Sequence, residues 1–117
     1  ARQPGMDTAK LSLLRNAMTA YAQRRRALSS NIANLDTPEY DRVSVSFEED
    51  LRAARSGMGG LEETSEVESH LEVNGDPPSL EQELMSLSDT QMRTRVASRA
   101  VREHFSLMQT AIKGRSG

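Results

Sequence analysis

The sequence predicts a mainly α-helical protein, in which a long N-terminal helix and a long C-terminal helix pair as an antiparallel coiled coil. Both terminal segments carry apolar residues at heptad spacing, and prolines end each pattern on its inner side. The segment between them is irregular, partly extended and expected to be mobile. We therefore divide the chain into an N-terminal unit of residues 1–40, an acidic, weakly structured middle of residues 41–78 and a C-terminal unit of residues 79–117.

The N-terminal segment predicts a helix from Thr8 to Leu35. Its apolar residues follow one another in alternating steps of three and four, with Arg25 as the exception. Pro38 disfavours helical backbone at Thr37, so we expect the helix to end near Leu35. The positions predicted to be buried in an assembly are Leu11, Leu14, Met18, Tyr21, Leu28, Ile32 and Leu35.

The C-terminal segment predicts a second helix. Ser79 and Gln82 have the spacing of a capping box, and Lys113 with Gly114 is typical of a helix end. The predicted assembly positions are Leu80, Leu84, Leu87, Val101, Phe105, Met108 and Ile112.

Polar residues occupy the centre of this second seam, at Gln91, Thr94 and Ser98. In one interpretation, Met92 and Val96 shift the buried face locally. In the other, the helices cross closely over small residues and the polar groups fix the register. The sequence favours neither interpretation.

The middle segment has weaker signals. Val43, Val45 and Phe47 alternate with serines, which indicates an extended strand. Residues 48–55 have the composition of one or two helical turns. We expect the acidic stretch of residues 62–76 to be mobile when the chain is alone.

The composition leaves little material for a core. Hydrophobic residues make up 36% of the chain, with two Phe and two Tyr, so we expect other copies or partner chains to cover the apolar seams. No apolar run is long enough to span a membrane, and the N-terminus lacks the hydrophobic centre of a cleaved signal peptide.

Charge is distributed unevenly. Residues 1–35 have a formal charge of +5, residues 36–78 of −9 and residues 79–117 of +2. Three consecutive arginines, Arg24 to Arg26, would need more basic groups on one face and stacking aromatics to form a nucleic-acid patch, and the overall acidity also argues against one. Pairing with the acidic segment of a neighbouring subunit is favoured, and we expect no nucleic-acid partner.

No pattern in the sequence indicates catalysis. Phosphate-binding loops, zinc-protease motifs and nucleophile–base arrangements are absent, and His70 and His104 each stand alone. The numerous carboxylates of the middle segment are typical of a solvated face. We therefore predict no enzyme activity, no catalytic residue, no cofactor and no metal.

One stretch carries a specific resemblance. Residues 29–40, SSNIANLDTPEY, resemble the SxNIANxxTPGY signature of the rod and hook proteins of the bacterial flagellum, and the run from Leu84 to Gly114 resembles the proximal rod members of that family. We expect Asn31 and Asn34 to bond backbone groups at the helix end and Tyr40 to pack back with its hydroxyl paired. The family usually has Gly where this chain has Glu39, so a positive φ there would be strained. The signature residues are Asn31, Ile32, Ala33, Asn34, Thr37, Pro38 and Tyr40.

The resemblance implies a structural subunit of the proximal rod. Such a subunit polymerises through its terminal helices into the hollow drive shaft that transmits torque from the membrane ring to the hook and lets export substrates pass. Its partners would be other copies, other rod proteins, and membrane-ring and export-gate components. It would lie in the periplasmic rod of the basal body, after type III export without a cleaved signal peptide. The alternative is a two-helix adaptor or chaperone-like module that binds a partner helix.

Overall fold

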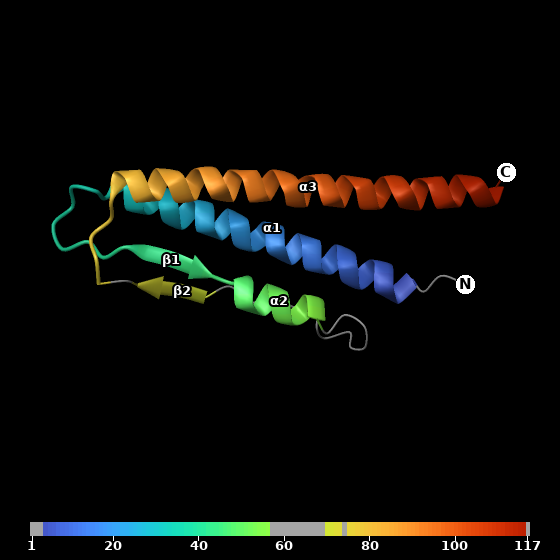
Figure 1. The fold of residues 1–117 in the computed structure, drawn as a ribbon, viewed down its shortest axis with the longest axis horizontal. Helices are drawn as coiled ribbons and strands as arrows, with labels where there is room; N and C mark the ends of the chain where they lie inside the picture. The colour runs from blue at the N-terminus through green and yellow to red at the C-terminus, as the bar shows by residue number, and fades with distance from the viewer. Residues whose placement is uncertain (1–3, 57–69, 74, 117) are drawn as a thin grey trace.

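The computed structural model describes residues 4–56, 70–73 and 75–116. The elements, in chain order, are α1 (Pro4–Ala33), β1 (Val43–Ser46), α2 (Glu48–Ser56), β2 (His70–Val73) and α3 (Leu80–Ser116). The two long helices pack side by side and run in opposite directions along a molecule of 64 × 26 × 14 Å (Figure 1). The small sheet and α2 lie along α1. The predicted pairing of two long terminal helices is confirmed.

The helix ends differ from the predicted ones. The first helix ends at Ala33, two residues before the predicted Leu35. The second begins at Leu80, as the capping pattern predicts, but it continues through Gly114 to Ser116. The prediction that Gly114 ends this helix is therefore wrong, because Gly114 is itself helical and does not adopt the positive φ of a glycine C-cap.

The middle segment is more regular than expected. The predicted extended strand and the predicted helical turns are confirmed as β1 and α2. Residues His70–Val73, expected to be mobile, form β2, which pairs antiparallel with β1 and sets Val43 opposite Val73 and Val45 opposite Leu71. β2 is extended, as expected for part of the middle, and its mobility stays a prediction. The rest of the stretch expected to be mobile includes residues 62–69 and 74, which lie outside the described residues.

A small core joins α1 to its neighbours. Phe47 is 1% exposed, and its ring meets the ring of Tyr21 edge-on with centroids 5.0 Å apart. The remaining buried members of this cluster are small: Ala17, Ala20, Ala27, Val45 and Ala97. Alanines let two helix backbones approach closely, but they bury little apolar area each, so the core is thin.

The face of α3 that packs in the fold is polar or small. Its most buried residues, Glu83, Thr90 and Ala97, recur every seven residues. Met92 and Val96 are 57% and 65% exposed, so they do not form the buried face of α3 within this fold. The residues packed there are small, and the idea that the polar groups fix the register stays a prediction, because Thr90 and Thr94 bond to carbonyls of their own helix.

The buried hydroxyls of this face are satisfied within the helix. Thr90 donates to the carbonyl of Ser86 at 2.7 Å, and Thr94 donates to the carbonyl of Thr90 at 2.8 Å. These two hydroxyls are therefore paired without a partner from another element.

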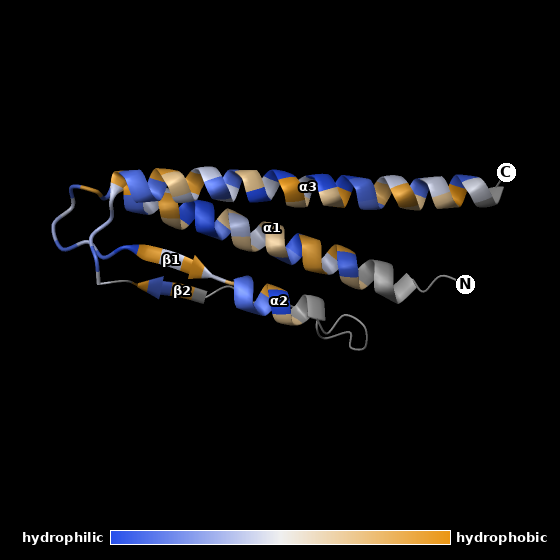
Figure 2. Ribbon diagram, viewed as in Figure 1, coloured by the Kyte–Doolittle hydropathy of each residue, from blue (hydrophilic) through white to orange (hydrophobic). Residues whose placement is uncertain are grey.

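Large apolar side chains of α3 point outward. Figure 2 shows apolar segments distributed along the whole of α3, including the part that extends beyond α1. The exposed large apolar residues are Leu80, Leu84, Met85, Met92, Val96, Phe105, Leu107 and Ile112 on α3, with Leu71 and Val73 on β2. The chain thus buries a polar face of its longest helix and leaves apolar faces uncovered.

Candidate functional site

The signature residues form the turn that follows α1. Asn34 donates through Nδ2 to the carbonyl of Ser30 at 2.8 Å, and its Oδ1 accepts from the hydroxyl of Thr37 at 3.0 Å. Backbone hydrogen bonds continue the turn from Thr37 to Asn34 and from Tyr40 to Thr37. The prediction that Asn34 bonds backbone groups at the helix end is confirmed.

Asn31 is the centre of this arrangement, and its side chain is fully buried. Its Oδ1 accepts from the backbone nitrogen of Val43 at 3.0 Å and from the hydroxyl of Tyr40 at 3.2 Å. Its Nδ2 donates to the carbonyl of Val43 at 2.8 Å and to Oε1 of Glu83 at 3.0 Å. A side-chain amide can form this set of bonds because it carries donors and an acceptor side by side. Both expectations, for Asn31 and for the Tyr40 hydroxyl, are confirmed.

Glu83 ties this turn to the C-terminal helix. Its side chain is fully buried, and its Oε2 accepts from Nε of Arg42 at 2.6 Å. Arg42 also donates through its backbone nitrogen to the carbonyl of Asp76, just before α3. The buried carboxylate is therefore both charge-paired and hydrogen-bonded, as a buried charge requires. We call the group of Asn31, Tyr40, Arg42 and Glu83 the signature node.

Sequence reasoning missed half of this node. The sequence alone identifies neither Glu83 nor Arg42 as part of such a group. One signal was available: Glu83 stands seven residues before Thr90 and fourteen before Ala97, on the small-residue line that packs in the fold.

The turn contains one strained residue. Glu39 has a φ of 62°, which is the left-handed region that glycine adopts without cost. The anticipated strain at the position where the family usually has Gly is present.

Arg24 is engaged within its own chain. Its guanidinium donates to the carbonyl of Val45 at 2.6 Å and to Oε1 of Glu48 at 2.7 Å, and it lies 4.6 Å from the ring centroid of Phe47. The hydrogen bond from Arg24 lowers the pKa of Glu48 below its ordinary value. The expected pairing with a neighbouring subunit is therefore wrong for Arg24, whereas Arg25 and Arg26 are exposed.

The predicted assembly positions fall into three groups. Tyr21 and Leu28 are buried. The exposed members are Leu80, Leu84, Phe105 and Ile112. The half-buried members are Leu11, Leu14, Met18, Ile32, Leu35, Leu87, Val101 and Met108. Their role in assembly stays a prediction, because a single chain shows no neighbour.

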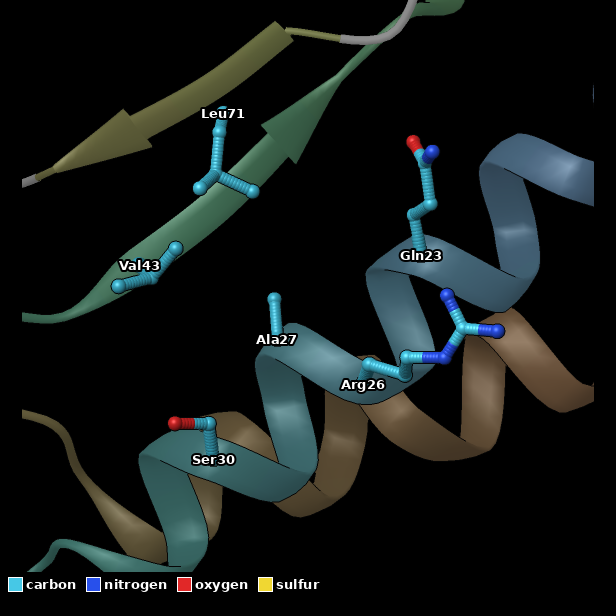
Figure 3. Close-up of a pocket in the computed structure, with 6 residues that line it drawn as sticks. All are labelled: Gln23, Arg26, Ala27, Ser30, Val43 and Leu71. Atoms are coloured by element: carbon cyan, nitrogen blue, oxygen red, sulfur yellow. The ribbon is translucent and has the colours of Figure 1, made fainter.

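Among the described residues, hollows border α1 on more than one side. The first lies between α1 and the sheet, with Leu71 of β2 and Val43 of β1 on one side and Ala27 and Ser30 on the other (Figure 3). Arg26 lines the same hollow from α1. Leu71 is 71% exposed although it pairs with buried Val45, so the inner face of the sheet extends past the edge of α1.

The second hollow is more apolar and lies between the three helices. Leu13 and Leu14 of α1 line it together with Leu51 of α2 and Met92 and Val96 of α3. Both hollows are open at the surface, and neither gathers converging catalytic groups.

The described residues show no metal or membrane site. Within residues 4–56, 70–73 and 75–116 no three His, Cys, Asp or Glu side chains are grouped as ligands of one ion. In the same ranges no helix has the length and apolarity needed to cross a bilayer. His104 stacks edge-on against Phe105, with the ring centroids 6.0 Å apart.

Comparison with known proteins points to one family. Residues 11–40, which contain most of α1 and the signature turn, match the family described as flagella basal body rod protein. Over 67 residues the chain is 39% identical to the flagellar basal body rod protein FlgB of Aeromonas hydrophila. The aligned segment covers 56% of this chain and 49% of that protein. The match thus spans about half the length of that relative. Both findings confirm the resemblance to flagellar basal-body rod proteins of the FlgB type.

Proposed function

From its likeness to the flagellar basal-body rod proteins, we propose that this chain is a structural subunit of the proximal rod of the bacterial flagellum. It polymerises through its terminal helices, and the resulting hollow shaft transmits torque from the membrane ring to the hook and lets export substrates pass. Its partners are other copies of itself, other rod proteins, and the membrane-ring and export-gate components that adjoin them in the periplasm.

The observation that carries this proposal is that α3 packs its polar and small residues within the fold and exposes its large apolar ones. The helix buries Glu83, Thr90 and Ala97 within the fold and exposes Leu84 by 49% and Phe105 by 43%. Exposed apolar residues spaced along a helix are costly in water, and packing against another helix removes that cost. A subunit that is completed by neighbours accounts for both the thin core and the exposed apolar residues.

The signature node supports a mechanical role. It joins the end of α1, the start of β1 and the start of α3 through hydrogen bonds of 2.6–3.0 Å. Buried Asn31 donates to the carbonyl of Val43 and to buried Glu83, and half-buried Arg42 donates to Glu83. Fully satisfied polar contacts in a low-dielectric environment fix one arrangement of the groups that they join. A rigid end of this kind suits a protein under torsional load.

The test is genetic and biochemical. In the source bacterium, we expect deletion to abolish motility and the tagged full chain to copurify with basal bodies. Ile32→Asp and Leu84→Asp would each place a charge at a predicted contact, and both should abolish assembly and motility. Thr19→Asp, which adds the same charge at an exposed site of α1 outside these positions, is the matched control and should leave motility intact.

Two outcomes would contradict the proposal. Motility that survives both Asp substitutions would show that these positions are not buried in an assembly. A chain that is required for motility but absent from purified basal bodies would be an adaptor or chaperone-like module instead.

A further inference from the structure

One exposed stripe of α3 changes the sign of its charge along its length. Glu81, Leu84, Ser88, Gln91, Arg95, Ser98 and Arg102 follow one another in alternating steps of three and four residues, so they lie on one face of the helix. All of them are exposed except Ser98, which is half-buried. We call this set the outer stripe. It is acidic at its start and basic towards its end.

The acidic end of the stripe belongs to a larger acidic tip. The signature turn and the residues that lead into α3 lie at the same end of the molecule (Figure 1). Residues 34–41 and 75–82 contain no Lys or Arg. Their acidic residues, all exposed, are Asp36, Glu39, Asp41, Asp76 and Glu81. Arg42 lies beside this tip, but it is 13% exposed and is paired with buried Glu83.

The opposite sign follows further along the same helix. Residues 90–102 contain four arginines and no acidic residue. Two of these arginines have a carboxylate nearby: Arg93 pairs with Asp89 at 2.8 Å, and Arg99 lies 3.6 Å from Glu103. The other two, Arg95 and Arg102, are exposed on the outer stripe and have no carboxylate partner among the described residues. Because the charges are separated along a long, thin subunit, parallel neighbours in register would place like charges side by side.

We propose that neighbouring copies pack in parallel along the outer stripe with an axial stagger that places the acidic tip of one copy against Arg95 and Arg102 of the next. This inference rests on the proposed function, since it describes how the same subunit polymerises. Exposed Leu84 and Phe105 lie on or beside the stripe and supply apolar contact, while the charges select the offset.

The stagger follows from the helix geometry. Arg95 and Arg102 stand 14 and 21 residues after Glu81. At roughly 1.5 Å per residue, the acidic tip and the basic segment are about 20–30 Å apart along the axis, which is the offset expected between neighbours. The contact joins the acidic tip of one copy to the basic segment of another. In a pair, one copy therefore still has a free tip and the other a free basic segment, so further copies can add at both ends.

Disulfide trapping tests this arrangement directly, because the chain contains no cysteine. Ser79→Cys marks the acidic tip and Ser98→Cys marks the basic segment, and both are small substitutions that leave every charge in place. The two positions are 19 residues apart, or about 28 Å along the helix, so they cannot form a bond within one chain.

We expect the full chain carrying both cysteines to give a ladder of cross-linked oligomers on oxidation at high protein concentration and low salt. A mixture of the two single-cysteine variants should give heterodimers, and high salt should suppress both products. A Ser79→Cys and Thr19→Cys mixture is the control and should give no cross-link, because Thr19 lies on exposed α1 surface away from the outer stripe.

Two results would overturn the stagger. A double-cysteine chain that stops at dimers would indicate an antiparallel pair closed by two bonds, and the absence of any cross-link between positions 79 and 98 would exclude the contact. Neither result bears on whether the chain is present in basal bodies, so a failure of this inference is distinguishable from a failure of the proposed function.

A charge exchange gives a second readout. Arg95→Glu with Arg102→Glu reverses the two exposed arginines of the outer stripe, and Asp41→Lys with Asp76→Lys and Glu81→Lys changes the formal charge of the five acidic tip residues from −5 to +1. Each variant alone should lose association, since its own two surfaces then carry like charges. An equimolar mixture should regain it, because the reversed tip of one variant meets the reversed segment of the other. Failure of the mixture to associate would contradict the proposed contact.

Discussion

The side-chain nitrogen of Asn31 donates a hydrogen bond of 3.0 Å to Oε1 of Glu83, and both side chains are fully buried. The two residues are 52 positions apart in the sequence and belong to the last turn of α1 and the first turn of α3. The contact links the signature turn to the start of the C-terminal helix, which explains why an asparagine stands at that position. A carboxamide can donate to Glu83 while it accepts from Tyr40 and from the backbone.

Asn31→Ala should destabilise the protein by at least about 2 kcal/mol. The change leaves the backbone nitrogen and carbonyl of Val43 and one oxygen of Glu83 without their partner, and each buried unpaired group costs roughly 1–3 kcal/mol. Urea unfolding followed by circular dichroism measures the difference. Asn34→Ala, which removes only the bonds to Ser30 and Thr37 at a more exposed site, is the control and should cost about 1 kcal/mol or less.

Arg42→Met should be more damaging, because it leaves the carboxylate of Glu83 buried without a cation. Removing one partner of a buried pair costs about 3–5 kcal/mol, whereas replacing both by apolar residues is often close to neutral. We therefore expect Arg42→Met with Glu83→Met to recover most of the loss in the same unfolding measurement. A double variant no more stable than the single one would show that the charge pair is not what stabilises this end.

Glu39→Gly should stabilise the protein by about 0.5–1 kcal/mol. The residue is held at a φ of 62°, where a side chain costs energy that glycine does not incur. Thermal unfolding measures the gain. Asp41→Gly is the matched control, since Asp41 is exposed and has no positive φ, and it should be neutral or slightly destabilising. Equal changes in melting temperature for Glu39→Gly and Asp41→Gly would contradict backbone strain at Glu39.

The ion pair of Arg24 and Glu48 predicts a pH dependence. The hydrogen bond from Arg24 lowers the pKa of Glu48 below its ordinary value of 4.5, so the folded state binds this proton less readily than the unfolded state. The stabilisation is present above pH 4.5 and is lost as the pH falls through the lowered pKa. Wild type should exceed Glu48→Gln in melting temperature at pH 6, and the difference should shrink below pH 4.5. A difference in melting temperature that stays constant with pH would show that ionised Glu48 does not stabilise the fold.

The long helices were predictable because apolar periodicity, proline and capping signals act locally. Pro38 and Pro77–Pro78 mark their inner limits, and the structure places the ends within a few residues. The helix faces were harder to predict. Leu84 and Phe105 lie on heptad positions, but the fold buries Thr90 and Ala97 instead, because small side chains let the helices approach closely. Periodicity identifies an apolar stripe without identifying what covers it.

The site was predictable only in part. The roles of Asn31, Asn34 and Tyr40 followed from the signature and from the hydrogen-bonding capacity of their side chains. Glu83 and Arg42 were missed, because the contact between them depends on how two distant segments meet and no local pattern encodes that. β2 was missed for a similar reason, since its four residues form a strand only through pairing with β1.

The most direct test of the central claim is a cryo-electron microscopy map of intact basal bodies purified from the source bacterium. We predict density for the α1–α3 pair in the rod, with the exposed apolar side chains of α3, among them Leu84 and Phe105, packed against neighbouring subunits. Rod density that cannot be fitted by this helix pair, or a fit in which that face of α3 remains in contact with solvent, would contradict the account.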